Sequence, residues 1–209
     1  MGTLYIVSTP IGNLEDITLR ALRILQEVDV IACEDTRRTA KLLTLLKLPL
    51  KQFIRYDDHK EQAATAEIFS LLESGKSVAL VSDAGTPLIS DPGFILVREA
   101  RKRDIPVVSI PGASALMTAL TSSGLPVDKF MFLGYPPEKS SHRLALFRSL
   151  TSINRLIGVT YVIYCAPHKL QSMLEDMETT LGAIEIVICR ELTKIHEETW
   201  RGTIEEAQK

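Results

Sequence analysis

The stretch VALVSDAGTPLISDPG, residues 78–93, decides the fold that we predict for this chain. Its first four residues are all apolar, which is typical of a strand buried on both faces of a sheet. The polar, glycine and proline residues that follow predict a rigid turn. Asp91 and Pro92 are suited to be the N-cap and the first residue of a helix that continues to Arg103. A strand, a turn and a helix in this order form the unit of α/β folds, which commonly place ligands at such turns.

Further apolar runs lie on both sides of this stretch. They are LYIV (4–7), VDVIAC (28–33), QFIRY (52–56), SVALV (77–81) and PVVSI (106–110). Amphipathic segments separate them: after Asp16 as a predicted cap, apolar residues from Ile17 to Val28 recur at helical spacing. A later helix is expected to begin with a capping box made by Asp58 and Glu61. This alternation predicts a mainly parallel sheet flanked by helices on both faces.

The composition changes after the fifth run. Small residues dominate IPGASALMTALTSSGLP (110–126), which predicts a close-packed helix that ends at Gly124. We therefore predict an N-terminal α/β domain over 1–123 and a C-terminal α/β domain over 124–209. Alternating strand-like and helical segments beyond the boundary predict a mixed sheet with helices. Thr203 and Glu206 form a capping-box pattern only a few residues before the last residue, so we expect the second domain to be incomplete at its C-terminus.

Composition and charge restrict the partners and the compartment. The 209 residues carry a formal net charge of −2, so an RNA partner would have to bind local basic patches. Neither an apolar run of membrane-spanning length nor a signal peptide is apparent, which predicts a cytoplasmic protein without a membrane partner. Cys33, Cys165 and Cys189 form no CxxC pattern and match no histidine spacing, so we expect reduced thiols and no metal site.

The first turn, STPIGN (8–13), lacks the glycine patterns of dinucleotide and nucleoside-triphosphate sites. Pro10 also has no backbone N–H to offer to a phosphate. The turn is therefore expected to set the path of the backbone and not to bind an anion. A rigid connector between strand and helix and a wall of a ligand site remain equally good interpretations.

The segment CEDTRRT (33–39) follows the second apolar run. Arg37 and Arg38 at the start of a helix oppose the helix dipole, so something should compensate their charge. Glu34 and Asp35 can do so through salt bridges. An anionic substrate such as an RNA backbone is the other interpretation.

The turn SDAGTP (82–87) has two interpretations as well. Asp83 can bind ribose hydroxyls or a cationic ligand while Gly85 lets the backbone approach a flat ligand closely, or Asp83 can simply form an Asx turn. A doubly wound sheet would bring this turn close to PGASA (111–115). In the second half, the segment around Lys139, His142 and Arg143 is either a ligand contact or a solvated helix start.

Taken together, these motifs closely resemble those of the tetrapyrrole methylase superfamily. The motifs are TPIGNLEDIT (9–18), EDTR (34–37), SDAGTPLISDPG (82–93), PGASA (111–115), FLGYPP (132–137), APH (166–168) and RELTK (190–194). They follow in order over essentially the whole chain, which is most similar to the branch of ribosomal RNA small subunit methyltransferases. The resemblance implies two domains of the class III methyltransferase type with a cofactor cleft between them, and a homodimer. It also implies S-adenosylmethionine-dependent methylation of the 2′-hydroxyl of a cytidine in small-subunit (16S) ribosomal RNA, free or within the assembled subunit.

The resemblance further implies which residues contact the cofactor. They are Pro10, Asp83, Ala84, Gly85, Ser114, Ala115, Cys165, Ala166, Leu192 and Thr193. A turn without a phosphate cradle agrees with this cofactor, because S-adenosylmethionine carries no phosphate. Cys165 and Ala166 depart from the branch, which usually has a glutamate before the Pro-His pair.

Methyl transfer to a ribose hydroxyl needs close positioning and a group that accepts the hydroxyl proton. We predict that Glu34 or Asp35 accepts it, with Lys194 as a further candidate. The residues predicted to contact RNA are Arg37, Arg38, Lys139 and Arg143.

Two other functions remain open at this point. One is a small-molecule methyltransferase acting on a porphyrin or corrinoid, although the charged EDTRR cluster favours a polyanion. The other is a nucleotide-responsive binding module without catalysis. Transfer of a labelled methyl group to purified small subunits would separate the three, and a steep loss of activity with salt would favour RNA.

Overall fold

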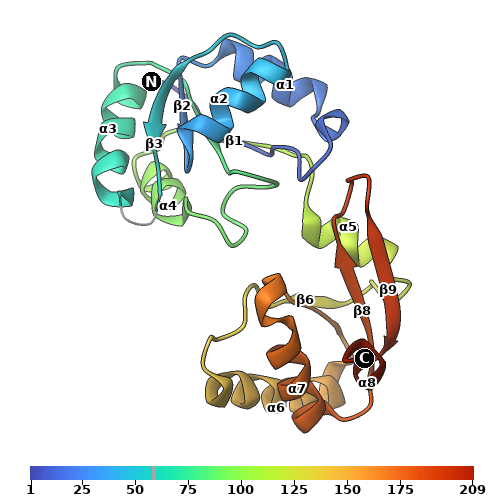
Figure 1. Ribbon diagram of the computed structural model, residues 1–209. Coiled ribbons are helices and arrows are strands. Elements are labelled where there is room, and N and C mark those ends of the chain that lie inside the picture. Colours follow the sequence, from blue (N-terminus) through green and yellow to red (C-terminus); the bar gives the residue numbers. More distant parts are fainter. Residues whose placement is uncertain (58–59) are drawn as a thin grey trace. The chain divides into compact units, whose positions relative to one another are not determined.

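The computed structural model describes residues 1–57 and 60–209, and it divides into two compact units, Met1–Ala115 and Leu116–Lys209 (Figure 1). Most of helix α5 (Ala115–Ser122) belongs to the second unit. The domain limits 1–123 and 124–209 stay a prediction. In the part of the chain that the structure describes, we found no helix long and apolar enough to cross a bilayer.

The first unit contains a five-stranded parallel sheet, as predicted. Its order is β3-β2-β4-β1-β5, with all four strand pairs parallel. The strands are β1 (Leu4–Val7), β2 (Val30–Cys33), β3 (Gln52–Arg55), β4 (Val78–Val81) and β5 (Val107–Ile110). The helices are η1 (Leu14–Asp16), α1 (Leu19–Glu27), α2 (Thr36–Leu45), α3 (Glu61–Glu73) and α4 (Phe94–Lys102). This order puts β4, the first four residues of the stretch 78–93, at the centre of the sheet.

Burial on both faces explains the unbroken apolar run of β4. Val78 and Leu80 pack in a core with side chains of α3 and α4, whereas Ala79 and Val81 pack in a second core with side chains of α1 and α2. Figure 1 shows the two helix pairs on opposite faces of the sheet. Because successive side chains of a strand point to opposite faces, both sets must be apolar.

Two helix starts differ from the sequence-based expectation. Helix α1 is capped by the Thr18 hydroxyl, which accepts a hydrogen bond from the Ala21 N–H, while Asp16 ends the short helix η1. Helix α4 begins at Phe94 after Gly93, so Asp91 and Pro92 lie in the preceding loop. Gly93 has φ 134° and packs so closely on Leu80 that a Cβ would lie 2.7 Å from Leu80 Cδ2. The capping box predicted for α3 includes Asp58, which lies outside the described residues.

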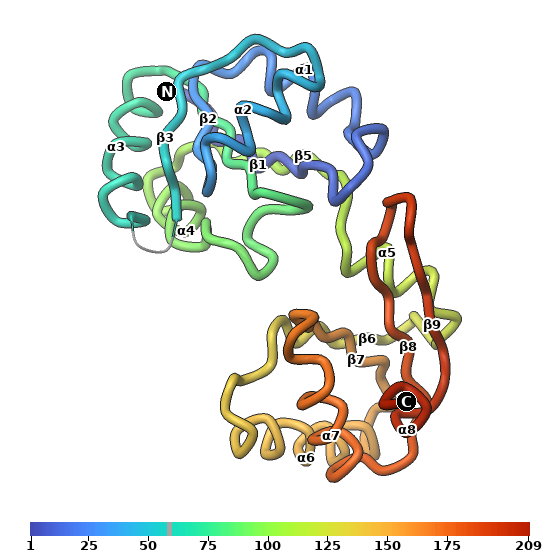
Figure 2. The backbone as a smooth tube through the Cα atoms, in the orientation of Figure 1, coloured from blue at the N-terminus to red at the C-terminus, as the bar shows by residue number. Residues whose placement is uncertain are grey.

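The second unit is a mixed arrangement of short strands and helices. Strand β6 (Phe130–Phe132) pairs in parallel with β7 (Thr160–Val162), and β8 (Glu185–Arg190) pairs antiparallel with β9 (Glu198–Thr203), a hairpin that Figure 2 traces clearly. The remaining helices are α6 (Ser140–Ile157), η2 (Pro167–Lys169), α7 (Leu170–Leu181) and α8 (Ile204–Ala207). Buried side chains of α6, α7 and α8 form one core. The capping box predicted for Thr203 and Glu206 is present at α8.

Candidate functional site

Three loops at the carboxyl edge of the first sheet are tied to one another. Thr9, after β1, and Gly85, after β4, exchange two backbone hydrogen bonds of 2.9 and 3.0 Å. The Thr86 hydroxyl lies 3.0 Å from the Ser8 hydroxyl and donates to the Ala113 carbonyl, after β5, at 3.1 Å. The turn SDAGTP and the segment PGASA therefore do lie together, because β4, β1 and β5 are neighbours in the sheet. That Ser8, Thr9 and Thr86 make these hydrogen bonds could not be predicted from the sequence.

These three linked loops form one wall of the candidate site, and Gly85 lies in the middle of it. Its φ of +84° is in the region that residues with a side chain rarely adopt. A Cβ would lie 3.3 Å from Ile11 Cγ2 and 3.7 Å from the Ala113 carbonyl oxygen. The turn therefore requires glycine both for its backbone conformation and for its packing. Pro10 is buried beside it, and Ala84 is exposed.

Asp83 extends from the same turn toward helix α2. Its Oδ2 lies 3.0 Å from Arg38 Nη1, whose side chain is 70% exposed. Its Oδ1 is shielded from solvent and has no hydrogen-bond partner among the described residues. An unpartnered buried carboxylate oxygen costs free energy, so this atom is suited to accept a hydrogen bond from a ligand.

Asp35 is engaged within its own segment. It caps α2 by accepting a hydrogen bond from the Arg37 N–H at 2.9 Å, and its carboxylate also binds the Arg37 guanidinium at 2.8 and 3.1 Å. Arg37 thus holds the pKa of Asp35 well below its usual range, through side-chain and then backbone hydrogen bonds. A carboxylate with a lowered pKa is a weaker proton acceptor, so these hydrogen bonds make Asp35 poorly suited to accept the hydroxyl proton. The arginines at the start of α2 are compensated by Asp35 and Asp83.

Cys33, at the end of β2, is expected to resist alkylation by iodoacetamide at pH 8 while the chain is folded. Burial raises the pKa of its thiol to about 11, and the thiolate that reacts is then on the order of one in a thousand molecules at pH 8. Because the shift is upward, the reactive fraction should rise as the pH approaches 11. Mass spectrometry of the Cys33 peptide before and after denaturation measures this. Equal labelling rates in the two states would contradict the burial of Cys33.

The loop between β8 and β9 combines backbone strain with an unpartnered hydroxyl. Glu191 has φ 51° and Thr193 has φ 67°, which is unusual for a β-branched residue. Thr193 Oγ1 is shielded and has no hydrogen-bond partner among the residues described. Such strain costs about 1–3 kcal/mol per residue and is concentrated at ligand sites. Leu192 is half-buried, and Lys194, a candidate proton acceptor, pairs with Glu191 at 3.0 Å.

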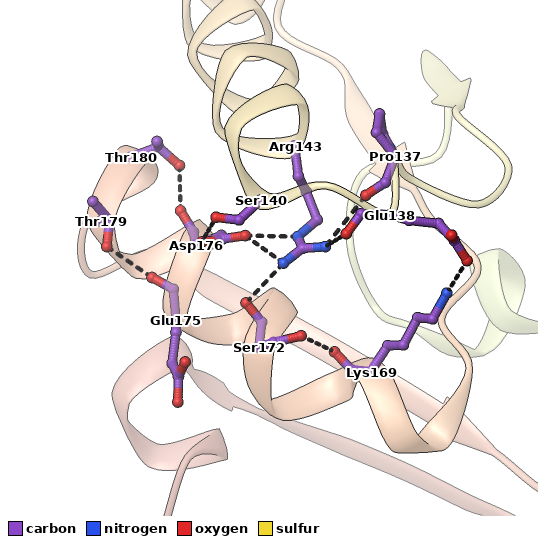
Figure 3. Close-up of polar contacts among 10 residues, drawn as sticks. All are labelled: Pro137, Glu138, Ser140, Arg143, Lys169, Ser172, Glu175, Asp176, Thr179 and Thr180. Atoms are coloured by element: carbon purple, nitrogen blue, oxygen red, sulfur yellow. Dashed lines mark hydrogen bonds and ion pairs between the residues drawn. The ribbon is translucent and has the colours of Figure 1, made fainter.

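Arg143 does not fit its predicted contact with RNA. It is buried, and all five of its N–H donors are directed to protein oxygens (Figure 3). These are Asp176 Oδ2 and the carbonyl oxygens of Pro137, Glu138 and Ser172. The sequence alone allowed either a ligand contact or a solvated helix start for Arg143, because its partner Asp176 lies on a different helix, α7, far along the chain. Lys139, by contrast, is exposed just before α6.

The remaining predicted residues lie at two loop positions. Ser114 and Ala115 are half-buried where the first unit ends. Cys165 and Ala166 are half-buried between β7 and η2. The Cys165 thiol has a pKa raised by burial, so it is a neutral group at physiological pH.

Comparison with known proteins now gives the class of this fold. The sequence pattern of the tetrapyrrole (corrin/porphyrin) methylases matches residues 3–208. A solved structure of uroporphyrin-III C-methyl transferase from Thermus thermophilus, complexed with S-adenyl homocysteine, superimposes with a TM-score of 0.65. It is 19% identical in sequence, and the match covers all of this chain and 92% of that one. This structural likeness shows the shared fold.

Proteins called ribosomal RNA small subunit methyltransferase I are considerably more similar in sequence. The one from Halalkalibacterium halodurans is 47% identical over 99% of this chain and 70% of its own length. The one from Thermotoga maritima is 46% identical over 99% of this chain and 90% of its own length. The chain belongs to the tetrapyrrole methylase family, within its group of ribosomal RNA small subunit methyltransferases I. Members of this family are S-adenosylmethionine-dependent methyltransferases, and this chain is one of them.

Proposed function

We propose that this protein transfers the methyl group of S-adenosylmethionine to the ribose 2′-hydroxyl of a cytidine in small-subunit ribosomal RNA. The observation that carries the proposal is identity of 46–47% over nearly the whole chain to relatives with that RNA in their names. A cytoplasmic location follows from such a substrate. A homodimer is part of the same proposal, and sedimentation velocity would test it.

The residues that we propose for donor binding are found in each unit. In the first they are the wall formed by Pro10, Asp83, Ala84, Gly85, Ser114 and Ala115, and in the second they are Cys165, Ala166, Leu192 and Thr193. Two unpartnered buried oxygens, Asp83 Oδ1 and Thr193 Oγ1, support this assignment. The donor's ribose hydroxyls and ammonium group can supply the missing hydrogen bonds. When bound, S-adenosylmethionine supplies a methyl group on a positively charged sulfur.

Methyl transfer also requires a residue of the protein to accept a proton. As the ribose oxygen forms its bond to the methyl carbon and the carbon–sulfur bond breaks, the hydroxyl proton must pass to an acceptor. Glu34 and Asp35 are the first candidates and Lys194 is a further one, and the hydrogen bonds from Arg37 make Asp35 the weaker acceptor of the two carboxylates by lowering its pKa. Glu34→Gln is expected to lower kcat while leaving donor affinity unchanged. Full turnover by this variant would remove Glu34 from the role.

The exposed cations Arg37, Arg38 and Lys139 are the proposed RNA contacts. We expect Lys139→Gln to weaken binding of small subunits and to reduce the slope of log affinity against log salt by about one. Lys139 is suitable because no ion pair is found for it in residues 1–57 and 60–209. Lys209→Gln, which removes another exposed charge, one that is paired with Glu205, is the control. An unchanged slope in the Lys139 variant would contradict an RNA contact there.

The deciding experiment is transfer of a radiolabelled methyl group from S-adenosylmethionine to purified small subunits that lack the modification. Incorporation into the RNA, mapped to a ribose of a cytidine by nuclease digestion, is the expected result. Incorporation into a porphyrin or corrinoid instead would favour the small-molecule function. Binding of the donor without transfer to any of these acceptors would favour a binding module.

A further inference from the structure

Three aromatic rings gather at the carboxyl end of the parallel pair β6–β7 in the second unit. Tyr164 lies edge-on to Phe132 with ring centroids 4.8 Å apart, and Tyr135 lies 5.5 Å from Tyr164. The backbone ladder continues to this point, because the Tyr164 N–H donates to the Gly134 carbonyl at 2.9 Å. Tyr135 is therefore attached directly to the end of the sheet. Tyr135 as a residue is nevertheless 64% exposed.

The loop that carries Tyr135 is held in place by hydrogen bonds from Arg143. Arg143 donates to the carbonyl oxygens of Pro137 and Glu138 at 3.2 and 3.1 Å, and its Nε donates to Asp176 of α7 at 2.7 Å (Figure 3). Pro136 and Pro137 also restrict the backbone. A ring presented on such a loop loses little conformational entropy when a ligand packs on it.

The charges of the loop that carries Tyr135 favour a polyanionic ligand. Lys139 is exposed on the same loop, and Glu138 is neutralised by Lys169 at 2.5 Å. An exposed aromatic ring beside cations is the combination by which proteins bind single-stranded nucleic acid, and stacking contributes about 1–3 kcal/mol per base. Bases that are unpaired in folded RNA are the ones that stack on aromatic side chains.

We propose that Tyr135 is the residue on which the RNA substrate stacks an unpaired nucleobase. This inference rests on the proposed function, since it concerns how the same RNA is bound. It assigns Tyr135 to substrate binding and not to the donor. The Arg143–Asp176 pair then acts as a positioning group that keeps the ring in place.

The test compares Tyr135→Ala and Tyr135→Phe with the wild-type enzyme. Steady-state methylation of small subunits and calorimetric binding of S-adenosylhomocysteine are measured for each. We expect Tyr135→Ala to raise KM for the subunit about tenfold, which corresponds to about 1.4 kcal/mol. Tyr135→Phe keeps the stacking face and should stay within about twofold of wild type. Both should bind S-adenosylhomocysteine as the wild type does.

Phe94→Ala is the matched control, because Phe94 is 63% exposed and lies in the first unit. It should change none of these values. Thermal melting checks that each variant is folded, and Tyr135→Leu replaces the alanine variant if that one is unstable.

Three results would overturn the inference while leaving the proposed function intact. These are an unchanged KM in Tyr135→Ala, an equal loss in Tyr135→Phe, and weaker binding of S-adenosylhomocysteine in place of a raised KM. The last would mean that the ring holds the adenine of the donor. If the wild-type enzyme methylates no small subunits, the proposed function itself fails, and this inference with it.

Discussion

Asp176→Ala is expected to lower the free energy of unfolding by about 3–5 kcal/mol, because it leaves the buried guanidinium of Arg143 without its counter-charge. The side chains of Arg143 and Asp176 are only 8% and 14% exposed. Water therefore cannot replace the missing carboxylate without opening the packing between α6 and α7. The same change also removes the acceptor for Ser140 Oγ, which lies 2.8 Å from Asp176 Oδ1.

Urea unfolding followed by circular dichroism measures this effect. Glu175→Ala is the matched control, since Glu175 is the adjacent acidic residue on α7 but is exposed. It should change stability by less than about 0.5 kcal/mol. The double variant Arg143→Met with Asp176→Leu removes both charges and should recover much of the loss. Equal, small effects of Asp176→Ala and Glu175→Ala would show that the buried pair contributes little.

The sheet could be predicted from the sequence because its signal is local. A strand buried on both faces must be apolar at every position, and β4 shows this over residues 78–81. The order of β4, β1 and β5 follows from the doubly wound pattern, and it brings residues 82–87 and 111–115 together. Helix starts were less predictable. Thr18 and Asp16 are both good caps, and only the path of the backbone decides which one is used.

The polar network of the second unit could not be predicted, for a physical reason. Arg143 and Asp176 are separated by 33 residues, and either side chain alone is typical of a solvated helix surface. Their pairing depends on how α6 packs on α7, which is set by apolar residues such as Phe147 and Leu174. In the same way, Asp35 was predicted as a proton acceptor from its residue type and position alone. In the structure it accepts a hydrogen bond from the Arg37 N–H as the N-cap of α2.

Gly85→Ala is expected to weaken binding of S-adenosylhomocysteine by roughly tenfold or more and to lower kcat/KM for methyl transfer accordingly. The new side chain would have to adopt φ +84° and would press on Ile11 Cγ2 at 3.3 Å. Relief of that strain requires the turn to move. Any such movement breaks the paired hydrogen bonds to Thr9 and displaces the wall that we assign to the donor.

Gly75→Ala separates this effect from the general cost of a positive φ. Gly75 has φ +91°, but nothing lies within 4 Å of where a Cβ would be placed. Gly75 precedes β4 and so lies near the amino end of that strand, whereas Gly85 follows its carboxyl end. Both variants should lose a similar amount of stability from the backbone alone, whereas only Gly85→Ala should lose affinity for S-adenosylhomocysteine in calorimetry. Normal affinity in a folded Gly85→Ala variant would mean that the donor does not contact this turn. Parallel losses in both variants would mean that affinity follows overall stability and not the shape of the wall.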